Sequence, residues 1–263
     1  MENEPAAGRL LQRSGIITID GLSGTGKSTL AGSLARRLGW LRLDSGAIYR
    51  ALAFLLLERG TADPSPQEAG KLAYILADEM DPQLFQGEIY IGVRLAGREL
   101  GGELRTRPVS ELASKAAAMP EVCQALLPFQ RAQGLKGNLV AEGRDMGSAV
   151  FPQAELKIVL KASAEVRAVR RYTERQKQGL ACSYPEVLAE QLARDRSDEV
   201  RLQPVLAQKP AAVRLDTTDL SAASVLNRAL ELAQTVFGLR PSLEFGGLQF
   251  SSPAASVSVP QRG

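Results

Sequence analysis

A glycine-rich loop close to the start of the chain constrains the fold more than any other feature. Residues 21–28 read Gly-Leu-Ser-Gly-Thr-Gly-Lys-Ser and fit the phosphate-loop pattern GxxxxGK[ST]. The apolar, β-branched residues 16–19 precede the loop as a buried strand would, and from Lys27 onward apolar residues recur at helical spacing. A strand, a glycine loop and a helix together predict an α/β protein that holds phosphate groups where backbone N–H groups converge at the helix N-terminus.

Each part of the loop has an expected role in binding ATP. The Lys27 side chain is expected to reach the β- and γ-phosphates, and the Ser28 hydroxyl is the expected ligand of Mg²⁺. ATP and Mg²⁺ are therefore the predicted co-substrate and metal. The predicted ATP-binding residues are Gly21, Leu22, Ser23, Gly24, Thr25, Gly26, Lys27, Ser28 and Thr29.

Composition narrows both the chemistry and the surroundings. The 263 residues include no His, which excludes Ser-His hydrolases, His-ligated zinc and imidazole acid–base catalysis. The two Cys make no disulfide framework, no apolar run approaches the ~20 residues of a membrane span, and the first residues lack the apolar stretch of a signal peptide. With a net charge of +3, nothing demands a nucleic acid or an acidic membrane as partner. We expect a cytoplasmic monomer that acts on small molecules.

Periodicity predicts one core of alternating strands and helices with appended ends. Short runs punctuated by glycine between residues 84 and 100 predict a small antiparallel insert. The alternation favours a parallel sheet with helices on both faces over residues 15–240, between a flexible lead-in at 1–14 and a disordered tail at 241–263. The expected strands are 16–19, 40–43, 139–141, 156–160 and 212–215, and the expected helices are 48–59, 71–77, 108–133, 164–178, 185–200 and 221–237.

The phosphate loop alone leaves several classes of protein open. A GTPase needs a guanine-reading Asn-Lys-x-Asp, and no Asn of this chain precedes a Lys. A motor ATPase stays possible at this point, because residues 139–142 form an apolar run that ends in Glu142. The compact chain favours a small-molecule kinase.

Two other segments supply charged side chains on the same side of the expected sheet. Residues 44–50 (DSGAIYR) and residues 142–147 (EGRDMG) each follow an expected strand. Loops at the carboxyl ends of parallel strands face one ligand crevice. Two arginines and two aspartates should therefore converge near the phosphate loop.

At these residues the sequence resembles the bacterial cytidylate kinases over roughly residues 15–237. The resemblance rests on the order and spacing of five segments. They are the phosphate loop, residues 44–50, residues 102–106 (GELRT), residues 143–147 (GRDMG) and the pattern RDxxDxxR at 194–201.

The resemblance implies phosphoryl transfer from ATP to CMP or dCMP, giving ADP and CDP or dCDP in pyrimidine nucleotide metabolism. It also implies a nucleoside-monophosphate kinase fold with a monophosphate-binding insert at about 46–112 and a helical lid at about 164–180. By position, Arg50 and Arg144 are expected to bind the acceptor phosphate. Ser45, Asp145 and Arg201 are expected to read the cytosine, while Ser114, Arg194 and Asp198 contact the sugar and its surroundings. The expected catalytic residues are Lys27, Arg50, Arg144, Arg167, Arg170, Arg171 and Arg194, of which Arg167, Arg170 and Arg171 lie on the lid.

Physical chemistry agrees with this assignment. A carboxylate such as Asp145 can accept from the cytosine amino group, whereas uracil presents a carbonyl there and would leave two acceptors facing each other. Arg194, Asp198 and Arg201 are spaced to share one helix face. The absent His is no obstacle, because the attacking CMP phosphate is already largely anionic, with a second pKa near ~6.

One position departs from the family pattern. Where the family has an Arg that helps to hold the pyrimidine, this chain has Cys123, which cannot donate in that way. Gln124 and Arg131 are the candidates for compensation. The resulting hypothesis is weaker CMP binding, or broader base tolerance, with the kinase reaction intact.

Two other functions remain open at this point. The first is another kinase of the same fold that acts on AMP or on a non-nucleotide alcohol. The second is a phosphate-loop module that binds ATP as a switch and transfers nothing to a small molecule.

Overall fold

The computed structural model describes residues 15–80, 83–85, 88–91, 94–95, 98–135, 137–177, 179–207 and 212–238. The predicted lead-in at 1–14 and the predicted tail at 241–263 lie outside these residues. The predicted boundaries of the insert and the lid remain predictions.

Strands of the described residues form a seven-stranded sheet in the order β3-β4-β2-β7-β1-β8-β9. Neighbouring strands run parallel except β3 and β4, which are antiparallel. A separate two-stranded hairpin joins β5 to β6. The strands are β1 (Ile16–Gly21), β2 (Leu41–Asp44), β3 (Gln83–Phe85), β4 (Glu88–Ile91), β5 (Arg94–Leu95), β6 (Arg98–Glu99), β7 (Leu139–Gly143), β8 (Leu156–Lys161) and β9 (Val213–Asp216).

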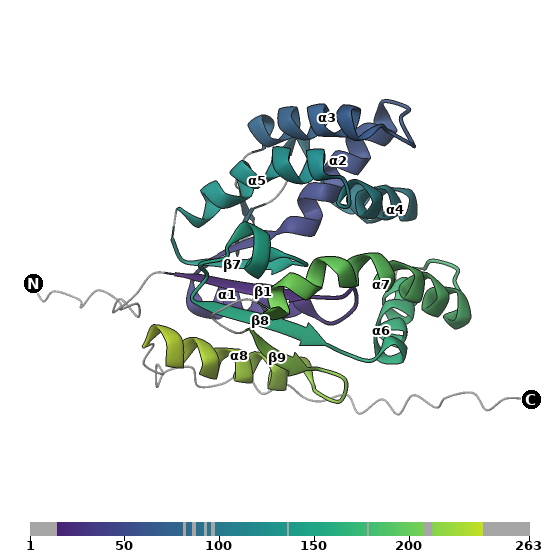
Figure 1. Cartoon of the computed structure of the whole chain (residues 1–263). Coiled ribbons are helices and arrows are strands. Elements are labelled where there is room, and N and C mark those ends of the chain that lie inside the picture. The colour runs from purple at the N-terminus through teal and green to yellow at the C-terminus, as the bar shows by residue number, and fades with distance from the viewer. Residues whose placement is uncertain are drawn as a thin grey trace, which may run out of the picture.

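Helices connect the parallel strands. In Figure 1, α2 to α5 gather on one side of the sheet, α8 lies on the other, and the arrow of β8 points toward α6 and α7. The helices are α1 (Lys27–Leu38), α2 (Ser45–Glu58), α3 (Pro66–Glu79), α4 (Arg107–Ala116), α5 (Pro120–Gly134), α6 (Ala164–Lys177), α7 (Tyr184–Ala207) and α8 (Ala222–Phe237), with short turns η1 (Gly102–Arg105) and η2 (Met146–Val150).

Two apolar clusters bury the two faces of the sheet. In β7, Leu139 and Ala141 belong to the cluster under α2 to α5, whereas Val140 belongs to the cluster under α1 and α8. This alternation is the period of two that a strand imposes on its side chains. Trp40 meets Phe237 edge to face at 5.0 Å between ring centroids and packs the far end of the second cluster. The predicted parallel sheet with helices on both faces is confirmed.

The predicted antiparallel insert is partly integrated into the main sheet. Strand β4 pairs in parallel with β2, with Arg42 opposite Tyr90 and Leu43 opposite Ile91, so β3 and β4 extend the main sheet. Among the strands that the structure describes, the hairpin of β5 and β6 stands apart from the main sheet. Strand patterning predicts that these segments are extended but not which strand they pair with, because the partner is distant in sequence.

Proline explains two differences in the helices. The single helix expected over 108–133 is two, because α5 begins at Pro120, where proline's missing N–H and fixed φ suit the first turn. For the same reason α3 begins at Pro66, five residues before the expected 71, behind a capping box of Ser65 and Glu68. The last helix, expected from residue 221, starts behind a capping residue, since the Ser221 side chain accepts from the Ser224 amide.

The register of the central strands aligns the segments that carry chemistry. Asp20 lies opposite Gly143 across β1 and β7, and Asp44 lies opposite Glu142 across β2 and β7. All three strands end at this level. The loops that follow them therefore share one edge of the sheet.

Candidate functional site

The phosphate loop between β1 and α1 has the backbone that an anion cradle requires. Gly24 and Gly26 have φ of 80° and 94°, in the left-handed region that favours glycine. Gly26 is the residue immediately before α1, so the amino end of that helix opens onto the loop. A Cβ on Gly24 would lie 3.0 Å from Cβ of Arg167, so α6 approaches the loop too closely for a larger residue.

Donors from α6 and α7 hold the outer side of this loop. Arg167 Nη1 and Gln191 Nε2 donate to the carbonyl of Ser23 at 3.2 and 3.0 Å, and Arg170 Nη1 donates to the carbonyl of Gly24 at 3.4 Å. In a planar trans peptide the N–H points away from the carbonyl. Because the carbonyls of Ser23 and Gly24 are fixed toward α6 and α7, the N–H groups of the residues that follow them point away from these two helices.

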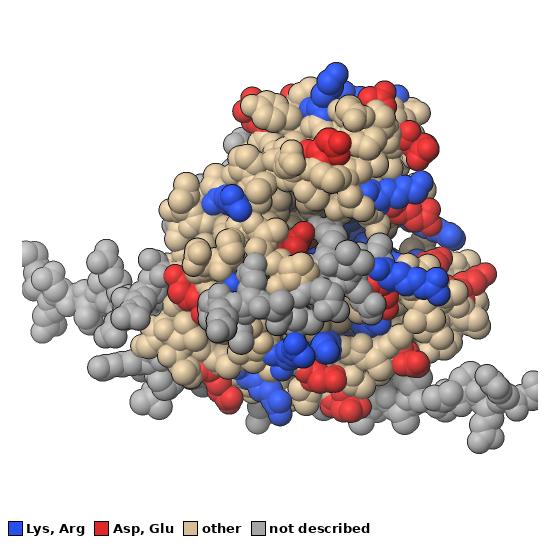
Figure 2. Space-filling model, in the orientation of Figure 1, with Lys and Arg blue, Asp and Glu red and all other residues tan. Residues whose placement is uncertain are grey.

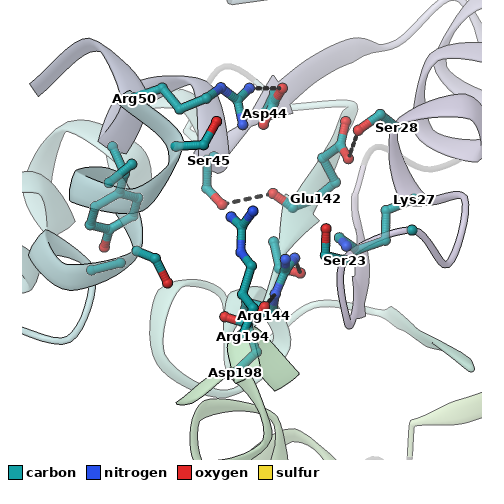
Figure 3. A pocket seen from close by; sticks show the side chains of 18 of the residues that line it. Ser23, Lys27, Ser28, Asp44, Ser45, Arg50, Glu142, Arg144, Arg194 and Asp198 are labelled. Atoms are coloured by element: carbon teal, nitrogen blue, oxygen red, sulfur yellow. Dashed lines mark hydrogen bonds and ion pairs between the residues drawn. The ribbon is translucent and has the colours of Figure 1, made fainter. Parts of the chain in front are cut away.

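A cavity of about 550 Å³ opens beside the loop and is walled by α1, α2, α4, β7, α6 and α7. Figure 3 shows Lys27 and Ser28 facing Arg50, Ser45 and Arg144 across it. Most of the predicted site residues line this one cavity. They are Ser23, Gly24, Gly26, Lys27, Ser28, Thr29, Ser45, Arg50, Ser114, Arg144, Arg170, Arg171, Arg194 and Asp198.

Positive charge is crowded in the cavity. Burial, followed by the nearby Arg144 charge, lowers the pKa of Lys27 well below its usual value, although Glu142 and Asp198 oppose the shift. Burial is also the main reason that the pKa of Arg194 is lowered, with Arg144 adding to it. Cations held close together without enough anions favour an anionic ligand, which relieves their repulsion. A polyphosphate therefore suits this cavity.

Glu142, at the end of β7, faces the loop. Its Oε2 accepts from the Ser28 hydroxyl at 2.7 Å, and its Oε1 accepts from Arg42 Nη2 at 2.6 Å. Burial, together with the Asp44 charge, raises the pKa of Glu142, and Arg42 and Ser28 act against that rise. Hydroxyl and carboxylate oxygens are ligands that Mg²⁺ accepts beside phosphate oxygens. The donor set of Ser28 and Glu142 therefore fits Mg²⁺.

Arg50 lies in α2, close to the residue that caps this helix. Its Nη2 donates to Asp44 Oδ2 at 3.0 Å, while Asp44 Oδ1 caps the helix by accepting from the Ala47 amide at 3.0 Å. Burial acts to raise the pKa of Asp44, but Arg50 and Arg42 outweigh it and the pKa is lowered. Among the described residues, the buried Nε of Arg50 has no hydrogen-bond partner. The Arg50 side chain as a whole is 26% exposed on the cavity wall, so its guanidinium can meet an anion there.

Arg144 and Ser45 are distant in sequence but line the same cavity. Arg144 Nε donates to Asp198 Oδ2 of α7 at 2.7 Å. The Ser45 hydroxyl donates to the backbone carbonyl of Glu142 at 2.9 Å, which uses its only proton. Toward the cavity, Ser45 can therefore act only as a hydrogen-bond acceptor.

Other predicted residues lie outside the cavity lining. Arg167 is buried and binds both carboxylate oxygens of Asp195, at 2.8 and 2.6 Å. The backbone carbonyl of Asp145 receives the amides that start η2, and its side chain is absent from the lining. Gly21, Leu22 and Thr25 of the loop are also absent from the lining, and the Thr25 hydroxyl donates to the Leu22 carbonyl at 2.9 Å. The side chain of Arg201 lies outside the described residues.

The structure gives Cys123 a local role. The Tyr49 hydroxyl donates to Cys123 Sγ at 3.6 Å, and the thiol donates to the Ala117 carbonyl at 3.4 Å. Tyr49 and Ala117 line the cavity, whereas Cys123 does not. Arg131, one of the two candidates for compensation, instead donates to the carbonyls of Val150 and Ala149.

Sequence reasoning missed several residues of the site. Glu142 was predicted only as a feature shared with motor ATPases, and Tyr49, Arg105, Ser110 and Glu174 line the cavity without having been assigned a role. Asp44, which was expected near the phosphate loop, lines the cavity as well. A signal was present for Glu142, since an acid at the end of an apolar strand beside a phosphate loop is a common metal-holding position.

The outer surface differs from the cavity. Figure 2 shows Lys and Arg interspersed with Asp and Glu over the described parts of one face. Across the helices that the structure describes, none combines the length and the apolar character needed to cross a bilayer.

Comparisons with known proteins agree with one another. A family described as cytidylate kinase matches residues 17–235. The chain is 42% identical over 219 residues to the cytidylate kinase of Pasteurella multocida (strain Pm70), covering 83% of this chain and 95% of that protein. It is 46% identical over 217 residues to the cytidylate kinase of Pseudomonas savastanoi pv. phaseolicola (strain 1448A / Race 6), covering 82% and 93%. A shikimate kinase structure from Acinetobacter baumannii matches at 16% identity and a TM-score of 0.37 over 84% of this chain and 94% of that one, which is too distant to add to these matches.

Proposed function

The chain belongs to the cytidylate kinase family, and from this we propose that it transfers the γ-phosphoryl group of ATP to CMP or dCMP, giving ADP and CDP or dCDP. The observation that carries the proposal is the single cavity shared by the phosphate loop and by Arg50, Arg144 and Ser45. A donor loop and an acceptor pocket that open on the same space are what direct transfer between two nucleotides needs.

Catalysis by these residues consists of positioning and charge stabilisation. The acceptor phosphate is already an anion, so the site needs no strong base to activate it. The Lys27 ammonium group stabilises the negative charge on the β- and γ-phosphates. The phosphates in turn favour the protonated form of Lys27, whose pKa burial lowers in their absence. Mg²⁺, held from Ser28 and Glu142, supplies neutralisation of phosphate charge when bound.

Arg50 and Arg144 are assigned to the acceptor phosphate. Asp44 keeps the guanidinium of Arg50 on the cavity wall, where the Arg50 side chain is 26% exposed. Arg144 is steered from the other side by Asp198. Two guanidinium groups from opposite walls can bracket one phosphate and align it with the loop.

Ser45 is assigned to the base. Its hydroxyl proton is committed to the Glu142 carbonyl, so only lone pairs remain for a ligand. An acceptor here accommodates the amino group of cytosine and opposes the carbonyl of uracil. Asp145 would reinforce this choice only after turning its carboxylate into the cavity, and Arg201 is kept as a proposed third base contact.

The lid assignment divides between two kinds of arginine. Arg170 and Arg171 line the cavity and are proposed to cover the ATP phosphates, while Arg194 of α7 lines it as well and stays assigned to the sugar and its surroundings. Arg167 is proposed to support them from behind, since Asp195 and the Ser23 carbonyl occupy its guanidinium. Closure of this region excludes water, which would otherwise hydrolyse ATP.

A coupled assay of ADP formation tests the proposal. The protein is mixed with MgATP and with CMP, dCMP, UMP, AMP or GMP in turn. Turnover with CMP and dCMP, and little with AMP or GMP, is the expected result. Turnover with AMP or an alcohol alone would assign the chain to another kinase reaction, and ATP binding without transfer to any acceptor would reduce it to an ATP-binding switch.

Cys123 is proposed to weaken the grip on the base relative to the family's Arg. Tyr49 turns its hydroxyl toward the Cys123 sulfur, and Arg131 is held at η2. We expect Cys123→Arg to lower the Michaelis constant for CMP. An unchanged or higher constant would sink this idea, and the exposed Gln124→Arg provides a matched added charge one residue away.

We also propose an oligomeric state, a location and a class of partner for the protein. A monomer in the cytoplasm, with small-molecule substrates and neither nucleic acid nor membrane as partner, suits a chain whose charged cavity is of nucleotide size. Sedimentation of the purified protein with and without ATP checks the monomer.

A further inference from the structure

Arg42 lies outside the cavity lining, yet it contacts the carboxylate that faces the phosphate loop. We propose that Arg42 is a positioning residue for Mg²⁺, which acts by holding the Glu142 carboxylate against the Ser28 hydroxyl. The inference rests on the proposed function, because it assigns a task within the same ATP site.

The two oxygens of Glu142 are divided between two partners. Arg42 Nε and Nη2 both donate to Oε1, at 3.1 and 2.6 Å. The Ser28 hydroxyl donates to Oε2, at 2.7 Å. With one oxygen held by a two-pronged guanidinium, the carboxylate cannot rotate without losing that contact, so the other oxygen stays directed at the loop.

The sheet brings the two side chains together. Arg42 in β2 pairs with Val140 of β7, and Glu142 lies two residues further along the same strand, on the same face. The side chains are only 16% and 2% exposed. Little water competes for the contact, so the orientation of Glu142 is set by Arg42.

Helix α1 leaves space for this guanidinium. A Cβ placed on Gly32 would come within 3.2 Å of Arg42 Nη1, so the smallest residue sits where the arginine passes. Arg42 therefore reaches Glu142 beneath the same helix whose first turn carries Ser28.

A hydroxyl and a carboxylate that already touch are prepared to share one cation. Partners of metal-binding groups fix the orientation of those groups, and their loss typically weakens metal affinity about 10- to 100-fold. A merely structural ion pair would instead change stability and leave metal affinity unaltered.

Metal affinity can be measured without any acceptor. Mn²⁺ is titrated into the full-length protein with saturating ADP and followed by electron paramagnetic resonance, with Arg42→Met compared with wild type. We expect Arg42→Met to weaken Mn²⁺ binding about tenfold while metal-free ADP binding is retained. Because CMP is absent, the result does not depend on which acceptor the protein uses; failure of the proposed reaction would appear only in the acceptor assay.

Two further variants make the assignment specific. Glu142→Gln should weaken Mn²⁺ binding to a similar extent, and the double variant should be no weaker than Glu142→Gln, because Arg42 acts only through Glu142. Arg228→Met on the exposed face of α8 is the matched control and should bind Mn²⁺ as wild type does.

Retained affinity would overturn the proposal. If Arg42→Met binds Mn²⁺ as tightly as wild type, or if the losses in the double variant add, Arg42 has no positioning role. Should Arg42→Met fail to fold, Arg42→Lys keeps the charge but lacks the two-pronged contact. It should then bind Mn²⁺ more weakly than wild type, and wild-type affinity in that variant refutes the inference.

Discussion

Asp20 ties the two halves of the site together, and its titration gives the most direct test of the buried geometry. It lies at the end of β1, one residue before the phosphate loop. Its two carboxylate oxygens accept from the amides of Met146 and Gly147, each at 2.9 Å. The segment that carries Arg144 is therefore anchored to the strand that carries the loop.

The pKa of Asp20 is raised from 3.8 to about 6, chiefly by burial. The hydrogen bonds from the two backbone amides lower this pKa, and the Asp145 charge adds to the rise. Because the folded pKa exceeds the unfolded one, the folded state binds the proton more tightly. The stability that this group contributes is full below about pH 4 and is lost as the pH rises through about 6. The shift of about two pKa units corresponds to about 3 kcal/mol, of which about 1 kcal/mol falls between about pH 5 and about pH 7.

Asp20→Asn removes this titration while keeping the size of the side chain. Its NH₂ group would face one of the two backbone N–H donors, so we expect a loss of about 1–3 kcal/mol in the free energy of unfolding. The advantage of wild type over the variant should shrink by about 1 kcal/mol from about pH 5 to about pH 7. Urea unfolding without nucleotide, at several pH values, measures the difference. Parallel stability curves across that window would refute the reasoning.

Three further substitutions test the site and the core. Lys27→Met should lower kcat at least about 100-fold in the coupled ADP assay, since it removes a cation that follows developing phosphate charge; near-normal turnover would contradict its role. Ser45→Ala should lower the ratio of CMP to UMP turnover in the same assay, and an unchanged ratio would show that Ser45 has no part in base selection. Leu126→Ala, at a fully buried position, should lower the free energy of unfolding by about 2–5 kcal/mol in urea, and a loss below about 1 kcal/mol would show that the core closes around the gap.

Most of the fold could be predicted because its central strands carry local signals. Residues 139–141 are apolar on both faces and residues 16–19 nearly so, with Thr18 the one polar residue, as is typical of strands buried between two helical layers. The pairing of β4 with β2 had no such signal, because Tyr90 meets Arg42 only through the tertiary fold. The break between α4 and α5 did have one in Pro120, which the helical spacing of the flanking residues obscured.

The site likewise has features that the sequence predicts and features that only the fold reveals. The phosphate loop is contiguous, so its sequence alone was sufficient. Arg167 and Arg170 are three residues apart on one helix, and spacing cannot tell that the first binds Asp195 while the second lines the cavity. The contact of Arg42 with Glu142 joins residues 100 apart in sequence, a distance at which no local pattern operates.

The central position of β1 has a consequence for the nascent chain. This strand is synthesised well before its hydrogen-bonding neighbours, which are β7 and β8, and β8 ends at Lys161. About 140 further residues must therefore be translated after Gly21, which takes roughly 7–30 s at about 5–20 residues per second. Both edges of this apolar strand lack their final partners until β7 has been translated at Gly143, and the edge that pairs with β8 lacks its partner until Lys161. A ribosome stalled before residue 139 should thus present β1 to chaperones, and the growing chain gains its nucleotide cradle only when translation has passed β8.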